Sequence, residues 1–248
     1  MLNSLMVLSS CLTSTPTTPT SSRSEPPPAT GSPAPTRSRS KTKKATKTPK
    51  SGNEKRIAEI TGAKYAIAVS NGTVGLQVAL FLAGVRPGDE VIVPTLSFIA
   101  TANAVAHAGA VPHFIDSELS TLGMSPEALR DRLTAMRRDA DGTLRNPLTG
   151  ARIAAISPMH TLGHPVRIEE IADIAAEFGI PLVEDAAESL GSFVTTRSGE
   201  RKHTGTFGIT GMISFNGNKT ITTGGGGVIL TDDDELGPLA KHLTTTAK

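Results

Sequence analysis

Short apolar runs alternate with helical patterns along most of the chain, from Asn53 onward. The runs hold few polar side chains, which is typical of strands that are buried on both faces. One of the helical patterns begins after a capping residue, Ser125. The predicted strands are "KYAIAV", "EVIVP", "VPHFID", "IAAISP" and "IPLVED", and the predicted helices span residues 73–82, 99–107, 126–136 and 168–178.

This alternation of strands and helices predicts an α/β fold built from βαβ units around a mostly parallel sheet. Right-handed crossovers would place helices on both faces of the sheet, which gives three αβα layers. Two further runs, "GMISF" and "GVILT", have no room for a helix between them and are predicted to form an antiparallel pair. The segment "DGTLRNPLTG" at residues 141–150 is predicted to be a polar loop.

The first 52 residues differ from the rest in composition. They are mostly Ser, Thr, Pro, Lys and Arg, so we expect a low-complexity, disordered tail at residues 1–52 and a folded domain at residues 53–248. Residues 1–50 carry eight Lys or Arg and one acid, whereas residues 51–248 carry 17 basic and 22 acidic side chains. The basic charge therefore belongs to the tail, and the charge of the whole chain does not indicate nucleic-acid binding.

Two motifs in the tail leave alternatives open. The stretch "RSRSKTKKATKTPK" is either a solvated tail or a patch for nucleic acid or an anionic surface. The start, "MLNSLMVLSSC", loosely resembles a lipoprotein cleavage site but lacks the positive region of a signal peptide. Cys11 is the only cysteine, which excludes an intramolecular disulfide and a cysteine-based metal cluster. Because the apolar runs are too short to span a membrane, we expect a cytoplasmic protein.

Candidate chemistry lies where the predicted strands end, since ligands of open α/β sheets bind beyond the carboxyl ends of the strands. After the first strand, "SNGTVGL" leads directly into a helix. The free N–H groups of a helix start suit a phosphate, which makes Gly72 and Thr73 candidate ligands. The same residues would also suit a tight, capped turn with no ligand.

Two other strand ends carry candidate groups. Phe98 comes shortly after "EVIVP". Its side chain is expected either to pack in the core or to lie over a flat ring bound at the sheet edge. Asp185 ends "IPLVED", and a carboxylate there could pair with a cationic ring nitrogen; Glu188 follows near the same mouth. A metal would be an alternative, but no cluster with ligand spacing surrounds Asp185, so no metal site is predicted.

Lys219 stands in "SFNGNKTITTGGGG", at residues 214–227. The spacing from Gly211 fails the P-loop pattern, so ATP binding by that route is not supported. A lysine amine can instead form a Schiff base with an aldehyde such as pyridoxal phosphate. That cofactor needs a phosphate cup, an acid facing its ring nitrogen and a stacking group. The chain offers one candidate for each: Gly72 and Thr73 with Ser214, then Asp185, and Phe98.

From about residue 57 to residue 248 the chain resembles the DegT/StrS-type (DegT/DnrJ/EryC/StrS) sugar aminotransferases, which are fold type I enzymes with pyridoxal 5'-phosphate. The resemblance implies an aspartate aminotransferase-like large domain. The branch most similar is the one that aminates nucleotide-linked keto-deoxy sugars in amino-sugar or surface-polysaccharide biosynthesis. The matching segments are "GAKYAIAVSNGTVGLQVAL", "GDEVIVPTLSFIATANAV", "VEDAAESLGS" and "SFNGNKTITTGGGGVILT".

The resemblance implies a role for each candidate residue. Lys219 would bind the cofactor covalently and shuttle a proton, and Asp185 would pair with the pyridinium nitrogen. Phe98 would stack on the ring. The phosphate would be bound by main-chain N–H groups of Gly72 and Thr73 and by the hydroxyl of Ser214. Glu188 would lie near the ring hydroxyl, and His160 would match a family histidine, with a structural role favoured over a catalytic one.

The resemblance also implies substrates and an oligomeric state, and the chain differs from the family at both of its ends. We expect glutamate as amino donor, a nucleotide-linked 4-keto-6-deoxy sugar as acceptor, and a homodimer. Relatives carry a helix before the first strand, where this chain has its Pro, Ser and Lys tail, and they continue past "HLTTTAK" into a smaller C-terminal domain. The chain is therefore expected to be a truncated copy without the small domain. The alternative is a catalytically inactive remnant or a binding protein of the same fold.

Overall fold

The computed structural model describes residues 52–245, and every structural statement below refers to them. The predictions for the basic stretch, for Cys11 and for the chain start lie outside the described residues. The first helix, α1 (Gly52–Thr61), begins one residue before the predicted domain boundary at Asn53. No helix within residues 52–245 is long and apolar enough to cross a membrane.

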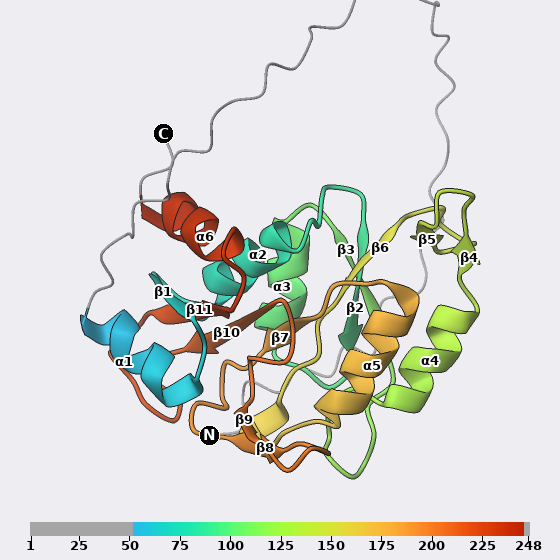
Figure 1. Ribbon diagram of the computed structural model, residues 1–248. Helices are drawn as coiled ribbons and strands as arrows, with labels where there is room; N and C mark the ends of the chain where they lie inside the picture. The colour runs from blue at the N-terminus through green and yellow to red at the C-terminus, as the bar shows by residue number, and fades with distance from the viewer. Residues whose placement is uncertain (1–51, 246–248) are drawn as a thin grey trace, which may run out of the picture. The chain divides into compact units, whose positions relative to one another are not determined.

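Seven strands form the central sheet in the order β1–β11–β10–β7–β6–β2–β3 (Figure 1). The two halves of the sheet are joined where single parallel bridges connect Ile156 with Leu182 and Met159 with Asp185. The strands are β1 (Tyr65–Val69), β2 (Glu90–Pro94), β3 (Val111–Ile115), β6 (Ile153–Ile156), β7 (Val183–Asp185), β10 (Thr210–Ser214) and β11 (Gly227–Thr231).

All neighbouring strands are parallel except at β11, which runs antiparallel to both β1 and β10. The mostly parallel sheet and the antiparallel pair of β10 with β11 are therefore confirmed. The placement of β11 between the first strand and β10 is an additional finding. Gly227 lies at its start, in register with Val69 on one side and with Ser214 on the other.

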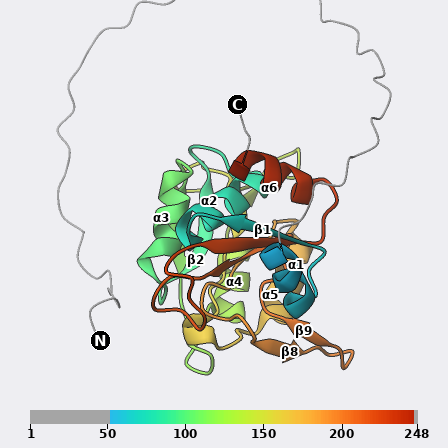
Figure 2. The same ribbon diagram turned by 90° about the vertical axis from the view of Figure 1, so that its left-hand side faces the viewer.

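Helices cover both faces of the sheet, as Figures 1 and 2 show, because neighbouring residues of each buried strand point to opposite faces. Val91 and Val93 pack with Leu76, Leu80 and their neighbours below α2 and α3. On the same face, α6 buries Ala240 against β1 and β11. These helices are α2 (Gly72–Leu82), α3 (Ile99–His107) and α6 (Leu236–Thr245).

The opposite face carries α1, α4 (Pro126–Thr134) and α5 (Ile168–Phe178). Ile92, which alternates with the two valines of β2, packs there with Leu129 of α4 and Ile171 of α5. The cap expected at Ser125 is present, since its hydroxyl accepts a hydrogen bond from the Ala128 N–H. The α/β fold with three layers is thus confirmed.

Several expectations were wrong in detail. Helix α1, which precedes the first strand, was not predicted, because the chain was expected to have its tail where relatives carry a helix. Helix α4 ends at Thr134 rather than at residue 136, and α6 was not predicted. The loop at residues 141–150 contains strand β5 (Leu144–Arg145), which pairs with β4 (Arg137–Arg138). A second hairpin joins β8 (Phe193–Thr195) and β9 (Arg201–His203).

A buried carboxylate holds the amino end of β2. Glu90 Oε1 accepts a hydrogen bond from the Thr149 hydroxyl (2.5 Å), and its Oε2 accepts one from Asn146 (2.9 Å) and lies 2.7 Å from His113 Nδ1. Burial acts to raise the pKa of Glu90, but these hydrogen bonds together outweigh it and lower the pKa. The charged carboxylate therefore stabilises the fold by tying β3 and the segment before β6 to β2.

Replacing Glu90 with glutamine is expected to lower the free energy of unfolding by about 2 kcal/mol at pH 7, the size typical of a lost charged hydrogen bond. Because the folded pKa lies below the unfolded one, this stability is present above the reference value of 4.5 and is lost as the pH falls through the folded pKa. Urea unfolding of both proteins between pH 7 and pH 3 measures the difference. Equal stability at pH 7 would contradict the assignment.

Candidate functional site

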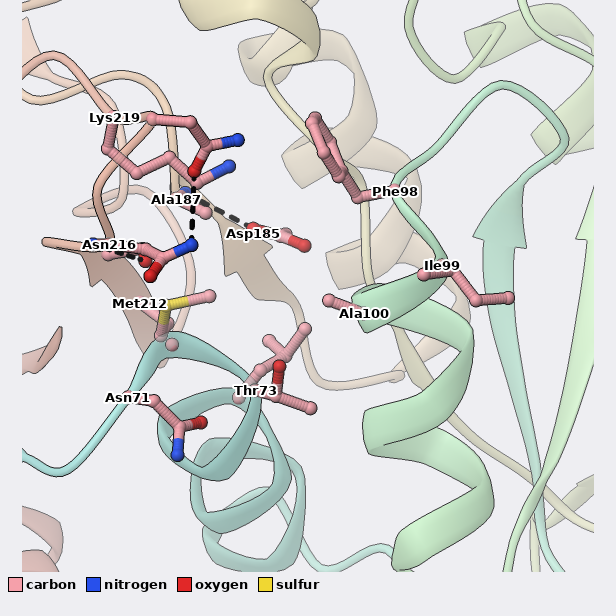
Figure 3. Close-up of a pocket in the computed structure, with 14 residues that line it drawn as sticks. Asn71, Thr73, Phe98, Ile99, Ala100, Asp185, Ala187, Met212, Asn216 and Lys219 are labelled. Carbon is pink, nitrogen blue, oxygen red and sulfur yellow. Dashed lines mark hydrogen bonds between the residues drawn. The ribbon is translucent and has the colours of Figure 1, made fainter. Parts of the chain in front are cut away.

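A pocket of about 520 Å³ opens at the carboxyl ends of β7 and β10, between the starts of α2 and α3 (Figure 3). Its walls come from four separate segments of the chain, at residues 71–76, 98–100, 185–187 and 212–219. Six of the predicted cofactor-binding residues line it: Gly72, Thr73, Phe98, Asp185, Ser214 and Lys219. The other lining residues are Asn71, Leu76, Ile99, Ala100, Ala187, Met212, Asn216 and Asn218.

The lower end of the pocket in Figure 3 is the amino terminus of α2. The Asn71 side chain caps this helix by accepting a hydrogen bond of 2.9 Å from the Val74 N–H. N–H groups of a first helical turn have no carbonyl partner within their own helix, and they attract anions. A Cβ atom at Gly72 would lie 2.9 Å from the Ser214 Cβ and 3.0 Å from its hydroxyl oxygen, so glycine keeps this concave end open.

Asp185 lies at the end of β7 and is buried, with 2% of its surface exposed. Its Oδ2 accepts a hydrogen bond of 2.7 Å from the Thr101 hydroxyl, and its Oδ1 accepts one of 3.1 Å from the Ala187 N–H. Burial raises the pKa of the Asp185 carboxyl, whereas these two donors and the Lys219 charge act in the opposite direction. The pocket therefore holds a carboxylate that would gain from a cationic partner.

Lys219 belongs to the loop after β10, and its side chain is almost fully buried. Its Nζ lies 4.1 Å from the centroid of the Phe98 ring and 3.1 Å from Glu188 Oε1. Figure 3 shows Lys219 and Phe98 facing each other, with Asp185 lying deeper between them. The fold thus brings together an amine, an aromatic ring and a carboxylate that are far apart in the sequence.

Glu188 is the one predicted cofactor-binding residue that does not line the pocket. Its Oε1 pairs with Lys219, and its Oε2 accepts a hydrogen bond of 3.0 Å from the Leu162 N–H. Leu162 has a φ of 54°, in the left-handed region that is uncommon for leucine. Glu188 therefore links the lysine to a strained turn, and its placement near a cofactor hydroxyl stays a prediction.

His160 is completely buried and does not line the pocket. Its Nδ1 accepts a hydrogen bond from the Val166 N–H at 3.3 Å, which leaves Nε2 to donate to Glu184 at 3.0 Å. Both ring nitrogens are thus engaged inside the protein. This geometry favours the structural interpretation of His160 over the catalytic one.

Sequence reasoning missed three polar residues of this region. Asn71 could have been found, because a residue of its type directly before a helix is a capping signal. Thr101 gave no such signal, since only the fold shows that the third residue of α3 points at Asp185. Asn216 lies near Ser214 in the wall of the pocket. Within residues 52–245 no group of His, Cys, Asp and Glu side chains could hold a metal ion.

Comparison with known proteins places these residues in context. Residues 40–247 match the DegT/DnrJ/EryC1/StrS aminotransferase family. The chain is 40% identical over 195 residues to EpsN of Bacillus subtilis (strain 168), whose name describes a pyridoxal phosphate-dependent aminotransferase. It is 40% identical over 190 residues to the GDP-perosamine synthase of Escherichia coli O157:H7. The alignments cover 79% and 77% of this chain, and 46% of each relative.

The structure is also similar to a crystal structure of a DegT DnrJ EryC1 StrS aminotransferase from Brucella abortus. The TM-score is 0.67 at 33% sequence identity, and the match covers 76% of this chain and 47% of that one. The chain therefore spans less than half the length of the proteins it matches. The family match begins at residue 40, before the start of the resemblance seen in the sequence at about residue 57.

Proposed function

The chain belongs to the DegT/DnrJ/EryC1/StrS aminotransferase family, and from that premise we propose that it acts as a pyridoxal phosphate-dependent aminotransferase. The acceptor would be a nucleotide-linked 4-keto-6-deoxy sugar, and the donor would be glutamate. We infer that residues 53–248 form the cofactor-binding large domain. The names of the relatives support the reaction class, because they describe an aminotransferase and a GDP-perosamine synthase.

The pocket fits the cofactor of this family in charge and shape. At one end of the pocket lie the amino terminus of α2, with Gly72, and the hydroxyl of Ser214, which together suit the phosphate. Its depth holds the buried carboxylate of Asp185, which suits a protonated ring nitrogen. Phe98 offers an aromatic face 4.1 Å from the Lys219 amine. The convergence of these groups on one cavity is the observation that carries the proposal.

When bound, pyridoxal phosphate supplies an aldehyde that condenses with amines and a ring that withdraws electrons from the bond to be broken. Asp185 would keep the ring nitrogen protonated, because its buried negative charge stabilises a cation more than water would. Lys219 would hold the cofactor and then accept and return the proton that moves between donor and product carbons. Phe98 would restrict the ring to one orientation by packing on its face.

Several features of the proposal concern the whole enzyme. The relatives named GDP-perosamine synthase support a nucleotide-sugar substrate and a role in surface-polysaccharide or amino-sugar biosynthesis. The homodimer expected from the resemblance and the cytoplasmic location stay predictions.

Titration of the purified chain with pyridoxal phosphate tests the cofactor step. We expect a new absorbance band near the visible edge, and borohydride reduction should attach the cofactor to the peptide that contains Lys219. A folded chain that forms no band at millimolar cofactor would overturn the proposal. The covalent label also separates a specific site from scattered reaction at surface lysines, because reduction would then modify many peptides.

A second candidate is a binding protein of the same fold without turnover. The observation that favours it is that the family match at residues 40–247 contains every residue that lines the pocket, and a pocket alone is enough for binding. Both candidates predict cofactor binding, so the assay that divides them is formation of amino sugar from glutamate and a GDP-linked keto-deoxy sugar. Product formation excludes the binding protein, whereas a labelled but inactive chain excludes the enzyme.

A further inference from the structure

Strand β7 carries two consecutive buried carboxylates, and only one of them faces the pocket. Asp185 lines the pocket, whereas Glu184 points to the opposite face, as neighbouring residues of a strand do. Glu184 has no exposed surface. A buried carboxylate without partners would cost several kcal/mol, so its surroundings must be built to hold it.

Four donors converge on Glu184. Its Oε1 accepts hydrogen bonds from the Phe207 N–H (2.6 Å) and the Gly208 N–H (2.7 Å). Its Oε2 accepts from the Gly205 N–H (2.7 Å) and from His160 Nε2 (3.0 Å). Each oxygen therefore accepts two hydrogen bonds, so the side chain has its partners inside the protein.

The turn at residues 203–208 is shaped around this carboxylate. Gly205 has a φ of 85°, which an L side chain rarely adopts, and a Cβ at Gly208 would overlap the carbonyl oxygen of Leu182. Three backbone N–H groups can point inward only because the turn passes this close to β7. The geometry is that of a specific receptor for one carboxylate.

The same contacts reach Asp185 through the neighbouring strand. The Asp185 N–H donates to the Pro158 carbonyl at 2.9 Å, and the His160 N–H donates to the Asp185 carbonyl at 3.0 Å. The backbone of Asp185 is therefore bonded to the segment whose His160 ring is held by Glu184. On the other edge, the Ala186 N–H donates to the Met212 carbonyl at 2.9 Å.

We propose that Glu184 is a positioning residue that fixes Asp185 at the depth where the cofactor ring nitrogen would bind. The cofactor in this inference rests on the proposed function, whereas the contacts of Glu184 and Asp185 do not depend on it. Glu184 acts in two ways. It locks the His160 ring and, through it, the backbone partner of Asp185, and it anchors the turn that leads into β10. A displacement of about 1 Å of a reacting group can change rates by about two orders of magnitude.

Glu184→Gln is the direct test, because it keeps the size of the side chain but replaces one carboxylate oxygen with an NH₂ group. Whichever oxygen is replaced, the NH₂ group then faces two hydrogen-bond donors. We expect cofactor affinity to fall by about tenfold or more, the size of effect seen when the partner of a metal-bound histidine is removed. The matched control is Glu90→Gln, which also removes the charge of a buried carboxylate beside a histidine but at the amino end of β2. The control should leave cofactor affinity within about twofold.

A double-mutant cycle separates positioning from a general loss of structure. If Glu184 acts through Asp185, Glu184→Gln should lower cofactor affinity in the wild-type background and change it little in an Asp185→Asn background. An equal loss in both backgrounds would overturn the proposal. Should Glu184→Gln fail to fold, His160→Phe serves instead, because it removes one donor and leaves the three backbone N–H groups in place.

Amide hydrogen exchange of the cofactor-free chain gives a readout that does not depend on the ligand. After each rate is corrected for the change in global stability of the variant, we expect the Asp185 and Ala187 amides to exchange at least about tenfold faster in Glu184→Gln, and to be unchanged in Glu90→Gln. Unchanged exchange at both amides in Glu184→Gln would overturn the role of Glu184. A wild-type chain that binds no cofactor would overturn the proposed function, while the exchange comparison still decides the role of Glu184.

Discussion

Replacing Lys219 with alanine is expected to abolish the cofactor absorbance band and the borohydride label, and to lower transamination by about 10²–10⁴-fold, the range for loss of a general acid–base group. The reason is geometric. Lys219 Nζ is the amine that the fold places inside the pocket, 4.1 Å from the Phe98 ring and 3.1 Å from Glu188. Absorbance titration and peptide mass spectrometry measure the loss.

Lys202→Ala is the matched control for this prediction. Lys202 also lies over a phenylalanine ring, with its Nζ 4.8 Å from the Phe207 centroid, but it does not line the pocket. Loss of the ammonium contact with an aromatic ring is thus common to both variants. Should Lys219→Ala retain the band while Lys202→Ala loses it, the covalent site would have been assigned to the wrong lysine.

Replacing Asp185 with asparagine is expected to change cofactor binding and stability in opposite directions. Breaking the pair with a cationic ring nitrogen should weaken cofactor binding by about 3 kcal/mol, or roughly 10²-fold. In the cofactor-free chain, by contrast, burial raises the pKa of Asp185 above its unfolded value, so the ionised carboxyl destabilises the fold at neutral pH. Asparagine removes that cost, and the cofactor-free variant should melt at a higher temperature.

The pH dependence has a definite sign. Because the folded pKa is raised, the destabilisation by Asp185 is largest above the folded pKa and disappears as the pH falls below the unfolded value. The stability advantage of Asp185→Asn should therefore shrink on acidification. Asp89→Asn is a useful contrast, because Asp89 pairs with the Arg152 guanidinium and its loss should lower stability. A lower melting temperature for both variants would contradict the assignment to Asp185.

Much of the fold could be predicted from local pattern. The helix over Ile99–His107 has its predicted bounds, and Ser125 caps α4 as expected. Helix α1 was missed because its sequence, "GNEKRIAEIT", is mostly polar and continues a polar tail. The lone reversed strand was recognised as part of a pair, but its insertion beside β1 depends on packing between the two ends of the domain, which periodicity does not encode.

The candidate site divides in the same way. Residue types at strand ends were enough to select Gly72, Asp185 and Lys219 as candidates for one ligand. Contacts between side chains from distant segments, such as Thr101 with Asp185 or Glu188 with Lys219, require the fold itself. Glu184 was not selected from the sequence, because its hydrogen-bond donors lie on a turn that follows it by about two dozen residues.

The position of β11 has a consequence for synthesis on the ribosome. Gly227 is hydrogen-bonded in register between Val69 and Ser214, so the last strand of the sheet fills a gap beside the first. Until residues 227–231 have left the exit tunnel, β1 has no neighbouring strand within residues 52–245, and the backbone groups that bond to β11 stay unpaired. The end of the pocket that we propose for the phosphate, made by the residues after β1 and by Ser214, is therefore completed only after residues 227–231 have been synthesised.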